Sequence, residues 1–108
     1  MQNQGLAMLD EALAIAQLEK RAMEDEEYDD AINLSIKRGK ITKEAWDFFT
    51  NDIREEYRTR LIKLNDIHAY LKKLASEAHA RVAASLLRSR QEKKRMRGYQ
   101  AAVVQALR

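Results

Sequence analysis

Apolar residues recur at helical spacing along almost the whole chain. Leu6, Leu9, Leu13 and Ala16 follow one another at intervals of three, four and three residues, which places them on one face of a helix. A later series keeps intervals of three and four, the spacing of a coiled-coil seam: Leu64, Ile67, Leu71, Leu74 and Ala78. The chain has no proline and only three glycines, so few residues interrupt these series. The pattern predicts an all-α fold.

The first long helix is predicted over about 4–38, with Asn3 as its N-cap. Gly39 suits the left-handed position that commonly follows a helix. The acidic segment 24–30 is a candidate break, but it contains neither glycine nor proline, and helical spacing resumes at Ala31. One helix is therefore favoured over two, which remains the alternative.

A short connecting helix is predicted over about 43–50, with Thr42 as its cap. The second long helix is predicted over about 53–97, since nothing stops it before Gly98. Asp52 and Glu55 have the spacing of a capping box at its start, although one unbroken helix from 43 onward stays open. Residues 99–108 then form either a short C-terminal helix or a flexible tail.

These elements predict one helical-bundle domain over residues 1–108, built as an antiparallel hairpin of two long helices. If the turn lies near residue 45, the numbers of facing residues sum to about 91, which brings the acidic segment 24–30 close to Arg60 and Lys63. The same register leaves the residues beyond about 90 without a partner in the first helix. We expect that part of the second helix to be free for other contacts.

Charge is distributed unevenly along the chain. Residues 1–54 hold 12 acidic and 7 basic side chains, whereas residues 55–108 hold 5 acidic and 13 basic ones. Basic side chains beside apolar residues at helical spacing are typical of a surface that binds a partner helix. The predicted partner-binding residues are Met96, Tyr99, Val103 and Leu107 for apolar contact, and Arg90, Lys94 and Arg97 for electrostatic steering.

The sequence offers no support for catalysis, a metal site or a cofactor. There is no cysteine, and the only histidines, His68 and His79, are 11 residues apart, about 16 Å along one helix. No apolar run approaches the roughly 18 residues that span a bilayer, and the first residues lack the basic region of a secretory signal. We therefore expect a cytoplasmic binding protein rather than an enzyme.

Two stretches resemble the FliT/FlgN type of flagellar export chaperone. Residues 27–34, Glu-Tyr-Asp-Asp-Ala-Ile-Asn-Leu, are similar to an aromatic–Asp segment late in that family's first helix, with Tyr28 where tryptophan is usual. Residues 62–99 look like the family's long charged helix, which ends in basic residues and an Ala/Gly–Tyr pair. The residues that match it are Leu64, Asp66, Ile67, Lys93, Lys94, Arg95, Gly98 and Tyr99. The middle segment, 40–51, matches little.

This resemblance implies a cytoplasmic chaperone for flagellar type III export. It would bind the amphipathic helical C-terminal region of a filament-cap or hook–filament-junction subunit, prevent premature polymerisation and deliver the client to the export apparatus and its ATPase. A structural or assembly coiled coil is the alternative, either a hairpin associated with a secretion ATPase or a homodimer. A basic helix that binds nucleic acid is less favoured, because the acidic first half would repel phosphate.

Overall fold

The computed structural model describes residues 3–106, except for the side chains of residues 99, 100, 102, 103 and 106. The chain divides into two units, residues 1–75 and residues 76–108. Its helices are α1 (Gln4–Glu24), α2 (Tyr28–Ala45) and α3 (Arg54–Ala106), and two short 3₁₀ turns, Trp46–Phe48 and Asn51–Ile53, join α2 to α3. No strand occurs among residues 3–106, so the all-α prediction is confirmed.

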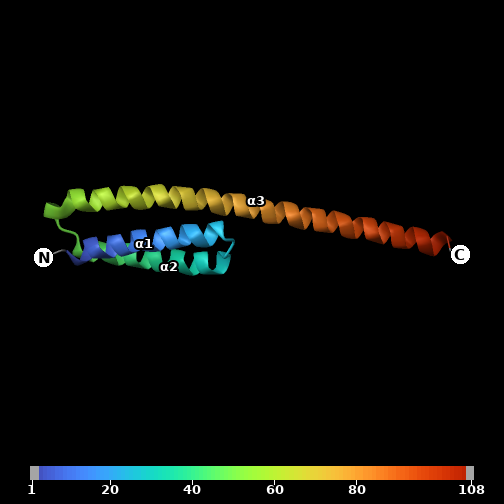
Figure 1. Ribbon diagram of the computed structural model, residues 1–108, viewed down its shortest axis with the longest axis horizontal. Coiled ribbons are helices and arrows are strands. Elements are labelled where there is room, and N and C mark those ends of the chain that lie inside the picture. Colours follow the sequence, from blue (N-terminus) through green and yellow to red (C-terminus); the bar gives the residue numbers. More distant parts are fainter. Residues whose placement is uncertain (1–2, 107–108) are drawn as a thin grey trace. The chain divides into compact units, whose positions relative to one another are not determined.

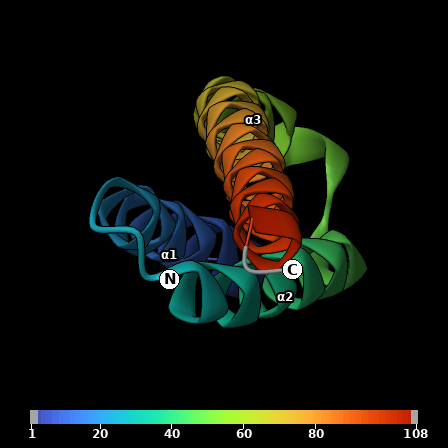
Figure 2. The same ribbon diagram turned by 90° about the vertical axis from the view of Figure 1, so that its right-hand side faces the viewer.

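Unit 1 is a three-helix bundle. α1 and α2 form an antiparallel hairpin, and the first part of α3 packs beside both of them (Figures 1 and 2). α3 runs parallel to α1, because Arg60 pairs with Asp10 and Tyr70 lies against Lys20, a constant offset of 50 residues. α2 is antiparallel to both helices, and the three together enclose one apolar core.

The core is centred on Tyr57, which is 1% exposed. Its hydroxyl donates a hydrogen bond of 2.6 Å to the carbonyl oxygen of Ala45 at the end of α2. Gly5 of α1 makes room for this side chain: a Cβ on Gly5 would overlap Tyr57 Oη and lie 2.7 Å from the Ala45 oxygen. The rest of the buried cluster consists of Leu6, Leu9, Ala12, Ala45 and Leu64. One tyrosine thereby joins all three helices at the same level.

The start of α1 is as predicted. Asn3 is its N-cap, and Asn3 Oδ1 accepts hydrogen bonds from the backbone N–H groups of Gly5 and Leu6 at 2.7 and 3.3 Å. The same side chain donates a hydrogen bond to the carbonyl oxygen of Phe48, 45 residues away. The cap therefore also ties α1 to the connection between α2 and α3.

The preference for one helix over 4–38 was wrong, because α1 ends at Glu24 and α2 begins at Tyr28. Glu26 adopts a left-handed backbone with φ of 61°. Its N–H bonds to the carbonyl oxygen of Met23, and the N–H of Glu27 bonds to that of Ala22. This is a Schellman ending, in which glutamate occupies the position that glycine usually fills. The break at the acidic segment is real although no glycine or proline marks it.

Both glycines predicted to end helices lie inside them. Gly39 belongs to α2 and Gly98 to α3, and a Cβ on either would meet nothing within 4 Å. Instead of a separate helix over 43–50, α2 continues to Ala45, with Thr42 donating its hydroxyl to the carbonyl oxygen of Arg38. The predicted break before the last long helix is present, and there the Asp52 carboxylate accepts the hydroxyl of Thr50.

α3 is one continuous helix of 53 residues, so residues 99–106 are neither a separate helix nor an irregular tail. The predicted two-helix register was also wrong. Arg60 faces Asp10 rather than the acidic segment 24–30, because that segment forms the turn between α1 and α2. The seam on α3 was predicted well: Leu64, Leu71 and Ala78 are buried.

Substitution of Gly5 and Gly39 by alanine should have opposite effects. Gly5→Ala forces a methyl group against Tyr57 and should lower the free energy of unfolding by about 2–4 kcal/mol. Gly39→Ala increases helix propensity on an exposed face and should raise the free energy of unfolding by about 0.5–1 kcal/mol. Urea unfolding followed by circular dichroism measures both, and a Gly5→Ala protein as stable as wild type would contradict the packing described here.

Glu26→Gly should stabilise unit 1. Glycine adopts a positive φ without the penalty of about 1–2 kcal/mol that an L-residue incurs there. Asp25→Gly is the matched control, since Asp25 has φ of −88° and gains no such relief. A gain with Asp25→Gly but none with Glu26→Gly in the same unfolding assay would contradict a left-handed turn at residue 26.

Candidate partner-binding surface

The second unit presents its side chains to solvent. Apart from Ala78, every side chain described from Ser76 to the end of α3 is exposed. Large apolar residues are among them, each more than half exposed: Val82, Leu86, Leu87, Met96 and Val104. Exposed apolar residues in such number on one helical segment are typical of surfaces that contact another molecule.

Basic residues accompany these apolar ones. Residues 76–106 carry seven basic and two acidic side chains, and six of the basic ones fall within 88–97. Arg90, Lys94 and Arg97 have i, i+4, i+7 spacing, so they lie on one face of α3. None of these three forms an ion pair with another residue in the described part of the chain. Their charge is free to attract an acidic partner.

Two of the exposed apolar residues and two of the basic ones lie close to one line along α3. Leu86 and Val104 are 18 residues apart, which is five complete helical turns, so they lie directly in line. Lys93 and Arg97 fall between them, within about 20° of that line. A complementary helix would need apolar residues opposite Leu86 and Val104, and acidic residues between them, opposite Lys93 and Arg97. We call residues 82–104 of this face the C-terminal stripe.

The structure places four of the predicted binding residues on this accessible surface: Arg90, Lys94, Met96 and Arg97. Met96 lies about 100° around the helix from Arg97, so it belongs to the edge of the C-terminal stripe. The side chains of Tyr99 and Val103 lie outside the described part of the structure, as does the whole of Leu107. Leu86 and Val104, which give the stripe its apolar ends, were not among the predicted binding residues.

A polar cluster joins the three helices of unit 1 near the middle of the bundle. Glu19 of α1 is 4% exposed, and its Oε1 accepts a hydrogen bond of 2.5 Å from Arg38 Nε of α2. Arg38 Nη2 also lies 3.4 Å from Nδ1 of His68 on α3. Arg38 thus neutralises a buried carboxylate, and the cluster has the character of a structural ion pair.

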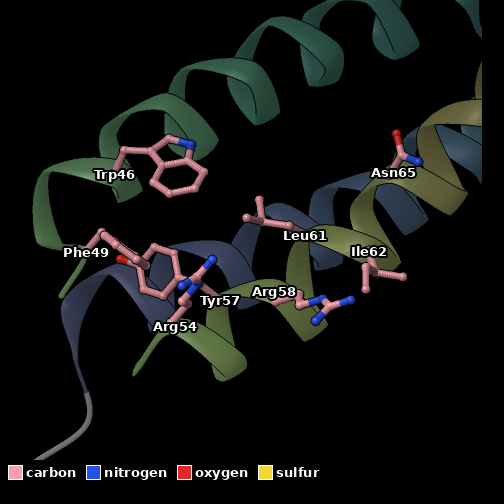
Figure 3. A pocket seen from close by; sticks show the side chains of 8 residues that line it. All are labelled: Trp46, Phe49, Arg54, Tyr57, Arg58, Leu61, Ile62 and Asn65. Atoms are coloured by element: carbon pink, nitrogen blue, oxygen red, sulfur yellow. The ribbon is translucent and has the colours of Figure 1, made fainter. Parts of the chain in front are cut away.

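An apolar hollow of about 410 Å³ opens on the surface of unit 1 between the end of α2 and the start of α3. Trp46, Phe49 and Tyr57 form its aromatic wall, with ring centroids 5.1–5.7 Å apart (Figure 3). The rest of the lining comes from Arg54, Arg58, Leu61, Ile62 and Asn65. The sequence did not predict this hollow, because the contribution of α3 depends on tertiary packing.

The titratable side chains of the described residues were considered for a metal site and for shifted pKa values. Among them, no three His, Cys, Asp or Glu side chains are grouped so that they could hold a metal ion. Burial raises the pKa of the Tyr57 phenol above its usual value of about 10, so this hydroxyl remains a hydrogen-bond donor to Ala45. Across residues 3–106, the helices lack a stretch long and apolar enough to cross a membrane.

Comparison with family models, with curated proteins and with solved structures found no match to this chain. Its function must therefore be argued from its own surfaces.

The ion pair between Glu19 and Arg38 makes a quantitative prediction. Arg38→Met leaves a buried carboxylate without its partner and should lower the free energy of unfolding by about 3–5 kcal/mol. The double variant Glu19→Met/Arg38→Met should recover most of that loss, because no buried charge remains. Urea unfolding of the single and double variants measures this coupling, and losses that simply add would contradict the pairing.

Proposed function

We propose that this protein is a cytoplasmic chaperone for flagellar type III export, which holds an amphipathic helix of its client on the C-terminal stripe. The client proposed is the helical C-terminal region of a filament-cap or hook–filament-junction subunit. The family resemblance of residues 27–34 and 62–99 suggests the pathway. The exposure of Leu86, Met96 and Val104 beside Arg90, Lys94 and Arg97 is the observation that supports helix binding.

The stripe has the properties that such a task requires. A subunit that polymerises through an apolar helical seam needs that seam covered until delivery. Helix-in-groove contacts provide this cover through apolar residues repeated at helical spacing. Basic residues between them add attraction to an acidic partner and speed association more than they strengthen the final complex. The protein would then bind its client selectively and still release it at the export apparatus.

A structural coiled coil, as a homodimer or beside a secretion ATPase, is the second candidate. The same exposed apolar residues favour it. However, parallel pairing of two copies through the stripe would bring like charges of segment 88–97 together, which costs energy on a coiled-coil surface. The charge therefore favours a different, acidic partner over a parallel second copy.

The proposal predicts a client complex that depends on the stripe. Purified C-terminal regions of a filament-cap subunit and of a hook–filament-junction subunit are titrated into the full-length protein by calorimetry. One of them should form a 1:1 complex. The triple variant Arg90→Glu/Lys94→Glu/Arg97→Glu should weaken it by roughly tenfold or more at low ionic strength, since three attractive charges become repulsive.

A matched control carries the same change in net charge on unit 1: Arg21→Glu/Lys37→Glu/Lys40→Glu should bind as wild type does. Equal weakening by both triple variants would show that overall charge, not the stripe, governs binding. If neither subunit binds but duplex DNA does, with affinity that falls steeply as salt rises, the protein is a nucleic-acid-binding protein and the proposal is wrong.

A further inference from the structure

A second hollow opens on the surface of unit 1. It has a volume of about 400 Å³. Residues of all three helices line it, among them Glu19 and Met23 of α1, Ile32 and Ser35 of α2, and Leu71 and Lys72 of α3. The aromatic hollow is lined by Trp46, directly after the other end of α2, and by an earlier part of α3. Because α2 and α3 are antiparallel, the two hollows follow each other along the groove between these helices.

Helical spacing aligns residues of the two hollows along α2. Ile32 and Gly39 are seven residues apart and lie on one face of α2, and Trp46, directly after the end of α2, continues the same spacing. Gly39, midway between the hollows, has no side chain, and nothing lies within 4 Å of where its Cβ would be. No side chain of Gly39 therefore stands in the groove, although Arg38 of α2 lies 3.4 Å from His68 of α3 beside it. We call this groove the α2/α3 groove.

The apolar residues of this groove are uncovered. Ile32, Trp46 and Ile62 are 57%, 50% and 51% exposed, although each lines or borders a hollow. From Ile32 to Trp46 the groove spans 14 residues of α2, about 21 Å at 1.5 Å per residue. An amphipathic helix of about four turns has this length, and its apolar face would fill both hollows as the fourth helix of a bundle.

The rim of the groove is basic. Arg54 and Arg58 line the aromatic hollow (Figure 3), and Lys72 lines the second one. None of these three side chains forms an ion pair with another residue among those the structure describes. Arg38, which also lines the second hollow, is already engaged by Glu19. A helix with acidic residues on both sides of its apolar face would supply the missing negative charge.

We propose that the α2/α3 groove binds an amphipathic helix of another protein whose apolar face is flanked by acidic residues. This surface lies wholly within residues 1–75 and is separate from the C-terminal stripe. The two surfaces give the protein two sites for helices, so it can bind a second helix without using the stripe. The basic segment 88–97 of a further copy is a poor occupant, because its charge matches that of the rim.

The test uses the full-length protein and two synthetic 16-residue peptides without tryptophan. Both carry leucine at helical positions 2, 6, 9 and 13; one has glutamate at the flanking positions and its twin has lysine. Trp46 is the only tryptophan of the chain, so its fluorescence reports on the groove directly. The glutamate peptide should shift the Trp46 emission to the blue and bind roughly tenfold more tightly than the lysine peptide at low ionic strength. Equal affinity for the two peptides, or no binding of either by calorimetry, would overturn the proposal.

Two variants locate the binding site. Arg54→Glu/Arg58→Glu should reverse the preference, so that the lysine peptide binds more tightly; both residues are exposed, and glutamate is favourable in the first turns of a helix. Ile62→Asp should lower the affinity for the glutamate peptide at least tenfold, whereas the matched variant Leu87→Asp should leave that affinity unchanged. Circular dichroism checks that each variant is folded. If Ile62→Asp and Leu87→Asp lower the affinity for the glutamate peptide equally, the peptide does not bind in the α2/α3 groove. If the wild-type protein is a dimer that Ile62→Asp dissociates, a second copy of the chain occupies the groove instead.

Discussion

The contact between Gly5, Tyr57 and Ala45 determines how unit 1 is built. Tyr57 fills the space that the missing side chain of Gly5 leaves, and its hydroxyl satisfies a backbone oxygen where α2 ends. This one residue therefore fixes the level of α3 against both α1 and α2. The offset of 50 residues between α1 and α3, seen at Asp10–Arg60 and Lys20–Tyr70, follows from it. So does the alignment of the two hollows along the α2/α3 groove.

The two units use similar amino acids for different purposes. In unit 1, apolar residues are buried around Tyr57, and the buried Glu19 is neutralised by Arg38. In unit 2, residues of the same types remain in solvent, and Arg90, Lys94 and Arg97 have no acidic neighbour to pair with among the described residues. Stability therefore resides mainly in unit 1. Exposed apolar and basic side chains in unit 2, and along the α2/α3 groove, are available for partners.

The features that the sequence predicted correctly are those that depend on residues close together in the chain. The all-α fold, the Asn3 cap, the seam through Leu64 and Leu71 and the exposed basic face of α3 all follow from residue type and helical period. The turn at Glu26 was missed because glutamate there occupies a position at which glycine is expected. Gly39 was wrongly predicted to end a helix, because a glycine is tolerated inside an exposed helix. The helix register and the α2/α3 groove depend on how Gly5 and Tyr57 meet across 52 positions of sequence, which no periodicity reveals.

The central claim is that Tyr57 anchors a stable bundle, whereas the C-terminal stripe makes few contacts within the free protein. Amide hydrogen exchange, measured peptide by peptide in the free protein, tests this claim most directly. Amides around Leu9 in α1 and from Tyr57 to Leu64 in α3 should be the slowest and should exchange together, at the rate of global unfolding. Amides of residues 86–104 should exchange orders of magnitude faster. Equal protection of residues 86–104 and of the residues around Tyr57 would contradict the account.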